Sequence, residues 1–126
     1  MIPVRINSIQ KKDLPKGPAV YIFSSQDKSL YVGRTDNLRR RFIAHTNGQE
    51  DFSTIKKRIM EYRGYSKIEA ENYMKNNFFM KYMTIRSEDI FGMEHFLIAM
   101  LKPLFNDGKR FKPKLRKKGF TTADLF

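Results

Sequence analysis

The chain contains no cysteine. A disulfide framework and a zinc site built on cysteine thiolates are therefore excluded, and the absence is compatible with a reducing intracellular environment. No apolar run approaches the roughly 18 residues that a membrane-spanning helix requires, and the N-terminal stretch MIPVRINSIQKKD lacks the hydrophobic core of a signal peptide. These absences predict a soluble, cytoplasmic protein with no membrane partner.

Acidic residues are scarce as well. Asp and Glu number 13 against 25 Lys and Arg, which gives a formal net charge of +12 over 126 residues. Such an excess favours a polyanionic partner, meaning DNA, RNA or an anionic membrane surface. The length suits one domain, and a hydrophobic content of 40% is typical of a folded globular protein rather than a disordered one.

The order of hydrophobic patterns predicts a small α/β fold of the α+β type. Strands are expected over residues 19–23, 29–33 and 78–85, and the first two should form a hairpin around the loop 24–28. Helices are expected over residues 36–45, 51–63, 67–77 and 87–101. The prediction is a three-stranded antiparallel sheet flanked by helices within residues 1–106, followed by a basic tail at 107–126.

Local signals fix some details of these elements. A five-residue hairpin loop would place Tyr21 opposite Tyr31, so that both phenols project from one face of the sheet. Thr35 or Asp36 is expected to cap the first helix, and Ser87 the last one. The run Ser66-Lys67-Ile68-Glu69 predicts a capping box, and Gly64 should end the helix before it.

The helix predicted over residues 87–101 carries a carboxylate inside its apolar stripe. Position 94 shares one face with Ile90, Leu97, Ile98 and Leu101. A carboxylate on such a face is costly to desolvate unless a cation meets it. Two explanations for Glu94 stay open: a structural ion pair with an arginine or lysine, or a metal ion at a phosphodiester site.

The helix predicted over residues 36–45 holds three consecutive arginines, of which only one points inward. Its inward stripe consists of Leu38, Arg41, Phe42 and His45. Arg39 and Arg40 point elsewhere. An inward guanidinium needs a planar anion, either a phosphate or a protein carboxylate. For His45 and for the two strand tyrosines, ordinary packing inside the domain is the alternative to a catalytic role.

Taken in order along the chain, these residues resemble the GIY-YIG nuclease superfamily. The matching positions are Tyr21, Tyr31-Val32-Gly33, Arg41, His45, Glu94 and Asn106. The segment LPKGPAVYIFSSQDKSLYVGRTDNLRRRF is especially similar to the N-terminal nuclease domain of the bacterial nucleotide-excision-repair endonuclease subunit. The family's first motif, Gly-Ile-Tyr, stands here as Ala19-Val20-Tyr21, and its closing Pro-x-x-Asn as Pro103-Leu104-Phe105-Asn106.

The resemblance implies a DNA endonuclease that hydrolyses phosphodiester bonds with one Mg²⁺ or Mn²⁺ held by Glu94. Its products would carry a 5′-phosphate and a 3′-hydroxyl. Hard cations accept a single carboxylate together with water and phosphate oxygens, so an acidic cluster is not required. Arg41 would neutralise charge in the transition state. A noncatalytic nucleic-acid-binding module on the same scaffold is the alternative, and the altered first motif supports it.

Other roles follow from the resemblance or from simple chemistry. The general base would be Tyr21 or Tyr31, with His45 as a rival because an ordinary histidine titrates nearer neutrality. Gly33 is expected to allow a tight turn after the second strand, and Asn106 to brace the site through hydrogen bonds.

Phosphate contacts are expected mainly from the tail. Residues 107–118 hold seven basic side chains and one acid, hence a charge of +6, half of the whole net charge. The alternative is a disordered, solubilising tail. DNA, branched or damaged forms included, is the expected partner. The predicted nucleic-acid-binding residues are Arg34, Arg39, Arg40, Lys109, Arg110, Lys112, Lys114, Arg116, Lys117 and Lys118.

Overall fold

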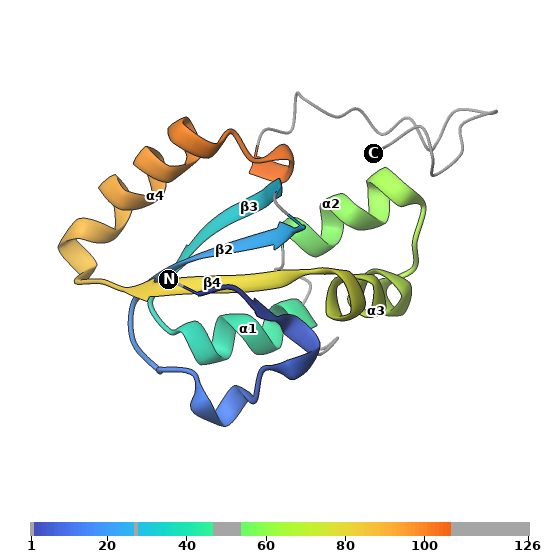
Figure 1. The fold of residues 1–126 in the computed structure, drawn as a ribbon, viewed down its shortest axis with the longest axis horizontal. Coiled ribbons are helices and arrows are strands. Elements are labelled where there is room, and N and C mark those ends of the chain that lie inside the picture. The colour runs from blue at the N-terminus through green and yellow to red at the C-terminus, as the bar shows by residue number, and fades with distance from the viewer. Residues whose placement is uncertain (1, 27, 47–53, 107–126) are drawn as a thin grey trace.

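The computed structural model describes residues 2–26, 28–46 and 54–106. Four strands form one antiparallel sheet in the order β1-β4-β2-β3 (Figure 1). Their bounds are Val4–Arg5 (β1), Ala19–Ser25 (β2), Lys28–Thr35 (β3) and Phe79–Thr84 (β4). The predicted α/β class is confirmed, with one strand more than expected. The extra strand, β1, is an exposed pair of residues beside β4, too short to show an alternating pattern.

Four helices surround the sheet, and three single 3-10 turns complete the described fold. The helices span Leu38–Thr46 (α1), Thr54–Arg63 (α2), Lys67–Asn77 (α3) and Ser87–Leu101 (α4). The turns span Ile6–Ser8 (η1), Lys11–Asp13 (η2) and Leu104–Asn106 (η3). None of the described helices is both long and apolar enough to cross a membrane.

The β2–β3 hairpin has a different register from the predicted one. Both strands extend further than expected, β2 to Ser25 and β3 back to Lys28, so Tyr21 pairs with Gly33 and Phe23 with Tyr31. The prediction that Tyr21 faces Tyr31 directly is therefore wrong. The mismatch amounts to two residues, which leaves both phenols on the same face of the sheet, with ring centroids 6.3 Å apart.

The two faces of the sheet carry separate hydrophobic cores. The larger core includes Tyr21, Phe23 and Tyr31 and gathers residues of α1, α2 and α3. On the opposite face, Val20, Ile22 and Val32 pack against α4, which Figure 1 shows set apart from the other three helices. The α4 residues in this contact are Ile90, Met93, Leu97 and Ile98. Leu101, predicted in the stripe, is 39% exposed, and Met93 packs in the stripe instead.

Two of the predicted helix caps differ from the structure. Thr35 is the last residue of β3, and the side chain of Asn37, rather than Thr35 or Asp36, accepts the Arg40 amide at 3.0 Å to cap α1. Arg86 occupies the N-cap position of α4, and Ser87 is its first helical residue. The Ser66–Glu69 capping box is confirmed, and Gly64, with φ of 69°, follows α2.

Candidate active site

The predicted site centres on a buried pair, Tyr21 from β2 and His45 from α1. The Tyr21 hydroxyl lies 2.7 Å from Nε2 of His45, and each residue is 1% exposed. Burial raises the pKa of Tyr21, and burial lowers the pKa of His45 well below its ordinary value of 6.5. The nearby cations Arg41 and Lys56 lower the His45 pKa further. Both side chains are therefore neutral at neutral pH.

Gly33 makes room for the Tyr21 ring, which lies directly across it. A β-carbon built on Gly33 would come within 2.3 Å of both Cζ and the hydroxyl oxygen of Tyr21. Gly33 sits inside β3 and pairs with Tyr21, so the tight strand-to-helix turn expected of it is wrong. A glycine is required here because the ring of its cross-strand partner, Tyr21, occupies the space of a side chain. The predicted register, which differs by two residues, paired Tyr21 with Tyr31 and so did not indicate this contact.

Gly33→Ala is expected to destabilise the fold by about 1–3 kcal/mol, because the added methyl group forces the Tyr21 ring out of its place. Urea denaturation followed by circular dichroism measures the change. Gly17→Ala is the matched control, since a β-carbon there meets nothing within 4 Å. Equal stability of the two variants would contradict the close approach of the ring.

Arg41 reaches both tyrosines. Its charge lowers the pKa of Tyr21 and of Tyr31, against the larger effect of burial, and it hydrogen-bonds the Tyr21 side chain. Arg41 is half-buried, whereas Arg40 is exposed and pairs with Asp36 at 2.8 Å. Among the three consecutive arginines, Arg41 thus lies against the phenols.

Glu94 lies on α4, on the opposite face of the sheet from the two phenols, and still acts on both of them. Its negative charge raises the pKa of both Tyr21 and Tyr31, so the carboxylate lies within electrostatic range of the two phenols. The side chain is 16% exposed, and Oε1 accepts a hydrogen bond from Nε of Arg34 at 2.9 Å. The structural ion pair considered for Glu94 is therefore present, with a strand arginine as the partner rather than Arg41.

The second carboxylate oxygen of Glu94 remains available for a cation. Within residues 2–26, 28–46 and 54–106, Oε2 has no hydrogen-bond partner, and no cluster of three or more His, Asp or Glu could hold a metal by itself. A single free carboxylate oxygen suits Mg²⁺ or Mn²⁺, which takes further ligands from water and phosphate. The donor set thus fits one hard, partly hydrated cation and does not fit a cation held by protein ligands alone.

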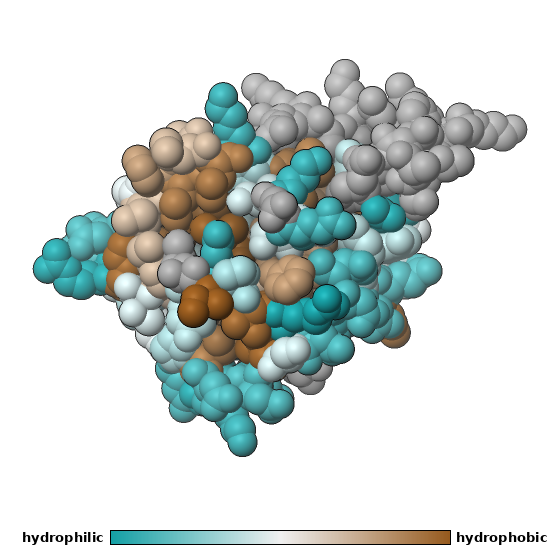
Figure 2. All heavy atoms as spheres, in the orientation of Figure 1, coloured by the Kyte–Doolittle hydropathy of each residue, from teal (hydrophilic) through white to brown (hydrophobic). Residues whose placement is uncertain are grey.

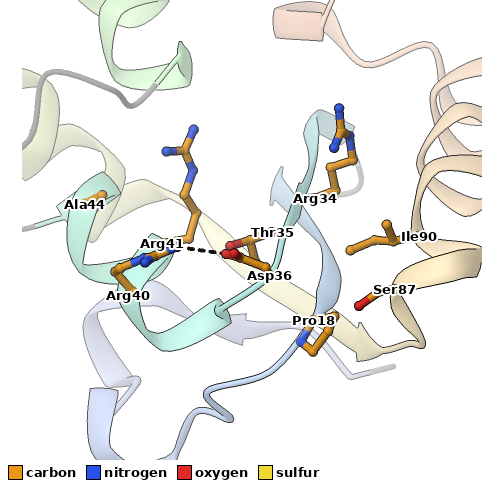
Figure 3. A pocket seen from close by; sticks show the side chains of 9 residues that line it. All are labelled: Pro18, Arg34, Thr35, Asp36, Arg40, Arg41, Ala44, Ser87 and Ile90. Atoms are coloured by element: carbon orange, nitrogen blue, oxygen red, sulfur yellow. Dashed lines mark hydrogen bonds and ion pairs between the residues drawn. The ribbon is translucent and has the colours of Figure 1, made fainter.

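A pocket of about 630 Å³ opens beside these residues, between α1 and the first turn of α4. Arg34, Arg40 and Arg41 supply its positive lining, and Figure 3 shows Arg34 and Arg41 extending toward the same side of it. Asp36, the acid in the lining, is already paired with Arg40. The pocket is therefore positively charged and suits a phosphate group. Its residues are Pro18, Arg34, Thr35, Asp36, Arg40, Arg41, Ala44, Ser87 and Ile90.

The predicted nucleic-acid contacts divide into three groups. Arg34 and Arg40 line the pocket. Arg39 instead donates to the carbonyl oxygens of Leu14 and Lys12, at 2.9 and 2.8 Å, and so anchors the N-terminal segment to α1. Its phosphate contact stays a prediction. The tail positions Lys109, Arg110, Lys112, Lys114, Arg116, Lys117 and Lys118 lie outside the described residues.

Asn106 braces β3, the edge strand of the sheet. Its side-chain oxygen accepts the Val32 amide at 2.7 Å, and its Nδ2 donates to the Val32 carbonyl at 2.7 Å. The amide thereby satisfies both backbone groups that an edge strand would leave open at this position. Because Val32 lies between Tyr31 and Gly33, this pairing fixes the segment that carries one phenol and supports the other.

The basic residues of α2 have individual roles that were not predicted from the sequence. Lys56 is buried, and its Nζ donates to Glu71 Oε2 at 2.9 Å and to the Ala44 carbonyl at 3.0 Å. Arg58 donates to the Phe105 carbonyl, and its charge lowers the pKa of Tyr31. Position 58 falls three residues after the buried Ile55, so helical periodicity alone could have separated it from Lys57.

The neutral state of His45 predicts an acid-sensitive fold. Below about pH 6.5 the unfolded chain binds a proton that the folded chain refuses, so stability falls by about 1.4 kcal/mol per pH unit as pH decreases toward the lowered pKa. Stability from this group is fully present above pH 6.5. Urea denaturation of the wild type and of His45→Gln at pH 7.5, 6.5 and 5.5 measures the difference between them.

The other histidine of the chain provides the control. His95 is exposed and stacks on Phe91, so His95→Gln should retain the acid sensitivity of the wild type. The wild type should lose more stability on acidification than His45→Gln does. Parallel curves for all three proteins would show that His45 has an unperturbed pKa.

Comparisons with known proteins place this fold in a family. The sequence profile of the GIY-YIG catalytic domain matches residues 17–103. The chain therefore belongs to the GIY-YIG family. A comparison with curated protein sequences gives no match.

Among solved structures, the fold is similar to the GIY-YIG N-terminal endonuclease domain of UvrC from Thermotoga maritima. With its magnesium-bound form the chain shares 20% identity and a TM-score of 0.54, over 77% of this chain and 91% of that one. A point mutant bound to the catalytic divalent cation gives 18% identity and a TM-score of 0.55, over 77% and 90%. At this identity the similarity establishes the shared fold.

Proposed function

We propose that this chain is a DNA endonuclease that hydrolyses phosphodiester bonds with the help of one divalent cation, Mg²⁺ or Mn²⁺. The observation that carries the proposal is the buried Tyr21–His45 hydrogen bond, reached by Arg41 on one side and by the half-satisfied carboxylate of Glu94 on the other. Arg41 and Glu94 are separate charges, since Glu94 pairs with Arg34. A phosphate and its cation can therefore lie between them.

Glu94 would hold the cation through Oε2. When bound, a divalent cation polarises the scissile phosphate and stabilises the leaving oxygen. The similar domain of UvrC has been solved with a catalytic divalent cation, which supports the same requirement here. Arg34 keeps the carboxylate in position through its bond to Oε1 and leaves the other oxygen available.

Proton transfer is assigned to Tyr21, with His45 as the group that receives the phenol proton. His45 is almost completely buried, so a proton reaches its Nε2 through the Tyr21 hydroxyl at 2.7 Å. In the proposed step, the attacking water gives its proton to the Tyr21 oxygen while the original phenol proton passes to Nε2 of His45, which holds it only transiently because its pKa is lowered. The hydroxide attacks phosphorus while the bond from phosphorus to the 3′-oxygen breaks, and the leaving 3′-oxygen takes a proton from water. Arg41 stabilises the negative charge that develops on the phosphate.

The substrate would be duplex DNA held through its phosphates, with a 5′-phosphate and a 3′-hydroxyl left after cleavage. Arg34, Arg40 and Arg41 line the pocket beside the site and supply positive charge for this contact. Branched and damaged duplexes are included among the proposed substrates. The cytoplasmic location stays a prediction from composition.

A noncatalytic nucleic-acid-binding module is the second candidate, because Arg34 already neutralises one oxygen of Glu94. The altered first motif supports it less than the sequence suggested. Ala19 is fully buried in β2 between Thr35 and Thr84, so a small side chain fits where the family has glycine.

Nicking of supercoiled plasmid DNA distinguishes the two candidates. The chain is incubated with plasmid in Mg²⁺, in Mn²⁺ and in EDTA, and DNA binding is measured in parallel by a mobility shift. The endonuclease predicts open-circular or linear product only with the metals. Binding without any cleavage, under each metal and across branched and damaged duplexes, would leave only the binding module.

A further inference from the structure

The outer surface of α4 is apolar where a surface helix is normally polar. No residue of α4 is buried, and Phe91, Phe96 and Met100 are 53%, 57% and 66% exposed. Figure 2 shows hydrophobic residues gathered over this helix. A patch of large exposed apolar side chains on one element marks an interaction surface. The α4 face is defined here by Phe91, Gly92, His95, Phe96, Ala99 and Met100.

The α4 face is symmetric about its own midpoint. Counting outward from the bond between His95 and Phe96, the small residues Gly92 and Ala99 lie at equal distances, and so do the large residues Phe91 and Met100. Two steps further out, the acid Asp89 corresponds to the base Lys102. A surface of this kind matches a second copy of itself when the two helices run in opposite directions.

We propose that two copies of this chain form a dimer in which their α4 faces pack antiparallel around a twofold axis between His95 and Phe96. The small residues Gly92 and Ala99 then oppose each other and allow close approach of the helices. A β-carbon at Gly92 meets nothing within 4 Å, so this part of the face is open.

Charge selects the antiparallel direction. Glu88 and Asp89 lie in the first turn of α4, where Asp89 pairs with Arg86 at 2.9 Å and one net negative charge remains, and Lys102 follows the last turn. Antiparallel packing places the acidic end of one helix beside the basic end of the other and aligns the helix dipoles favourably. Parallel packing would place acid beside acid. The Arg34 guanidinium that bonds Glu94 also lies 4.1 Å from the centre of the Phe91 ring, so one edge of the α4 face borders the candidate active site.

Solution mass and one substitution at the centre of the face provide the first test. The wild-type chain is expected to sediment at twice its mass of 15.0 kDa, and Gly92→Arg at 15.0 kDa, because the arginine side chain blocks the close approach. Arginine favours helix over glycine, and the position is open in the monomer, so the substitution does not unfold the chain. Ile68→Arg, on the exposed side of α3 at 69% exposure, is the control and should stay dimeric.

Single cysteines test the direction of packing, since the chain has none of its own. In the antiparallel pair, position 95 lies about 1.5 Å along the axis from its own counterpart, and position 100 about 14 Å away, from the helical rise per residue. His95→Cys should therefore form a disulfide-linked dimer on mild oxidation, and Met100→Cys should not.

Three outcomes would overturn the proposal. The first is a wild type that stays at 15.0 kDa throughout a concentration series, as expected if residues 107–126 or another protein cover the face. The second is a dimer that persists in Gly92→Arg. The third is equal crosslinking of His95→Cys and Met100→Cys, which indicates a different arrangement. None of these measurements depends on nuclease activity, so they test the dimer independently of the proposed function.

Discussion

Glu94→Gln is expected to lower the rate of Mg²⁺-dependent DNA cleavage by at least about 10³-fold, because a metal that stabilises the transition state by several kcal/mol loses its protein ligand. The amide has the same shape and can still accept the hydrogen bond from Arg34, so the fold should be retained. DNA binding should persist, since the arginines of the pocket are unchanged. Single-turnover cleavage with saturating protein measures the effect on chemistry alone.

The matched control for this variant is Glu61→Gln on the exposed side of α2, which makes the same change of charge outside the site. Its cleavage rate should equal that of the wild type. A Glu94→Gln variant with full activity would reject Glu94 as the metal ligand. A variant that also lost DNA binding would assign the residue to the binding surface instead of the metal.

Arg41→Ala is expected to reduce cleavage by about 10²–10³-fold, the usual loss when a preorganised donor to the transition state is removed. Arg41 contacts the Tyr21 side chain and lowers the pKa of both phenols, so its removal also makes the Tyr21 phenol a weaker acid that passes its proton to His45 less readily. Arg40→Ala makes the same chemical change one residue earlier. Arg40 is exposed and paired with Asp36, so that variant should stay within about threefold of the wild-type rate, in line with the weak effect of exposed ion pairs.

The comparison between the two arginines also controls for DNA binding. Both line the pocket, so both variants should bind DNA somewhat less tightly, and the difference between them should lie in the single-turnover rate at saturation. Equal losses of this rate would contradict the placement of Arg41 beside the phenols. Arg41→Lys should recover part of the rate, because it restores the charge without the planar guanidinium.

Helical periodicity explains why much of the site was predictable. A period of 3.6 residues separates Arg41 from Arg39 and Arg40 and places Glu94 beside Ile90, Leu97 and Ile98, as the structure also has them. Leu101 fails the same rule, since it is exposed near the end of α4. The helical period predicts which face of α4 points to the sheet. It does not predict where along the helix the sheet ends, and so it did not indicate that Leu101 is exposed.

Long-range partners were not predictable in the same way. Arg34 approaches Glu94 from a residue 60 positions away, and Lys56 meets Glu71 between two different helices. Neither pair leaves a local pattern. The hairpin register also depends on backbone pairing by Ser24 and Ser25, which have no apolar alternation to indicate it. Gly33 could be interpreted only once that register was known.

The dependence of the cleavage rate on metal concentration tests the central claim most directly. A 5′-labelled duplex is cut under single-turnover conditions over a series of Mg²⁺ concentrations, and the product ends are identified. One cation held by Glu94 predicts no cleavage in EDTA, a simple saturation curve with a Hill coefficient near one, and products with a 3′-hydroxyl and a 5′-phosphate. Cleavage that continues in EDTA, or a rate that rises with the square of the metal concentration, would contradict a site with a single carboxylate and a single cation.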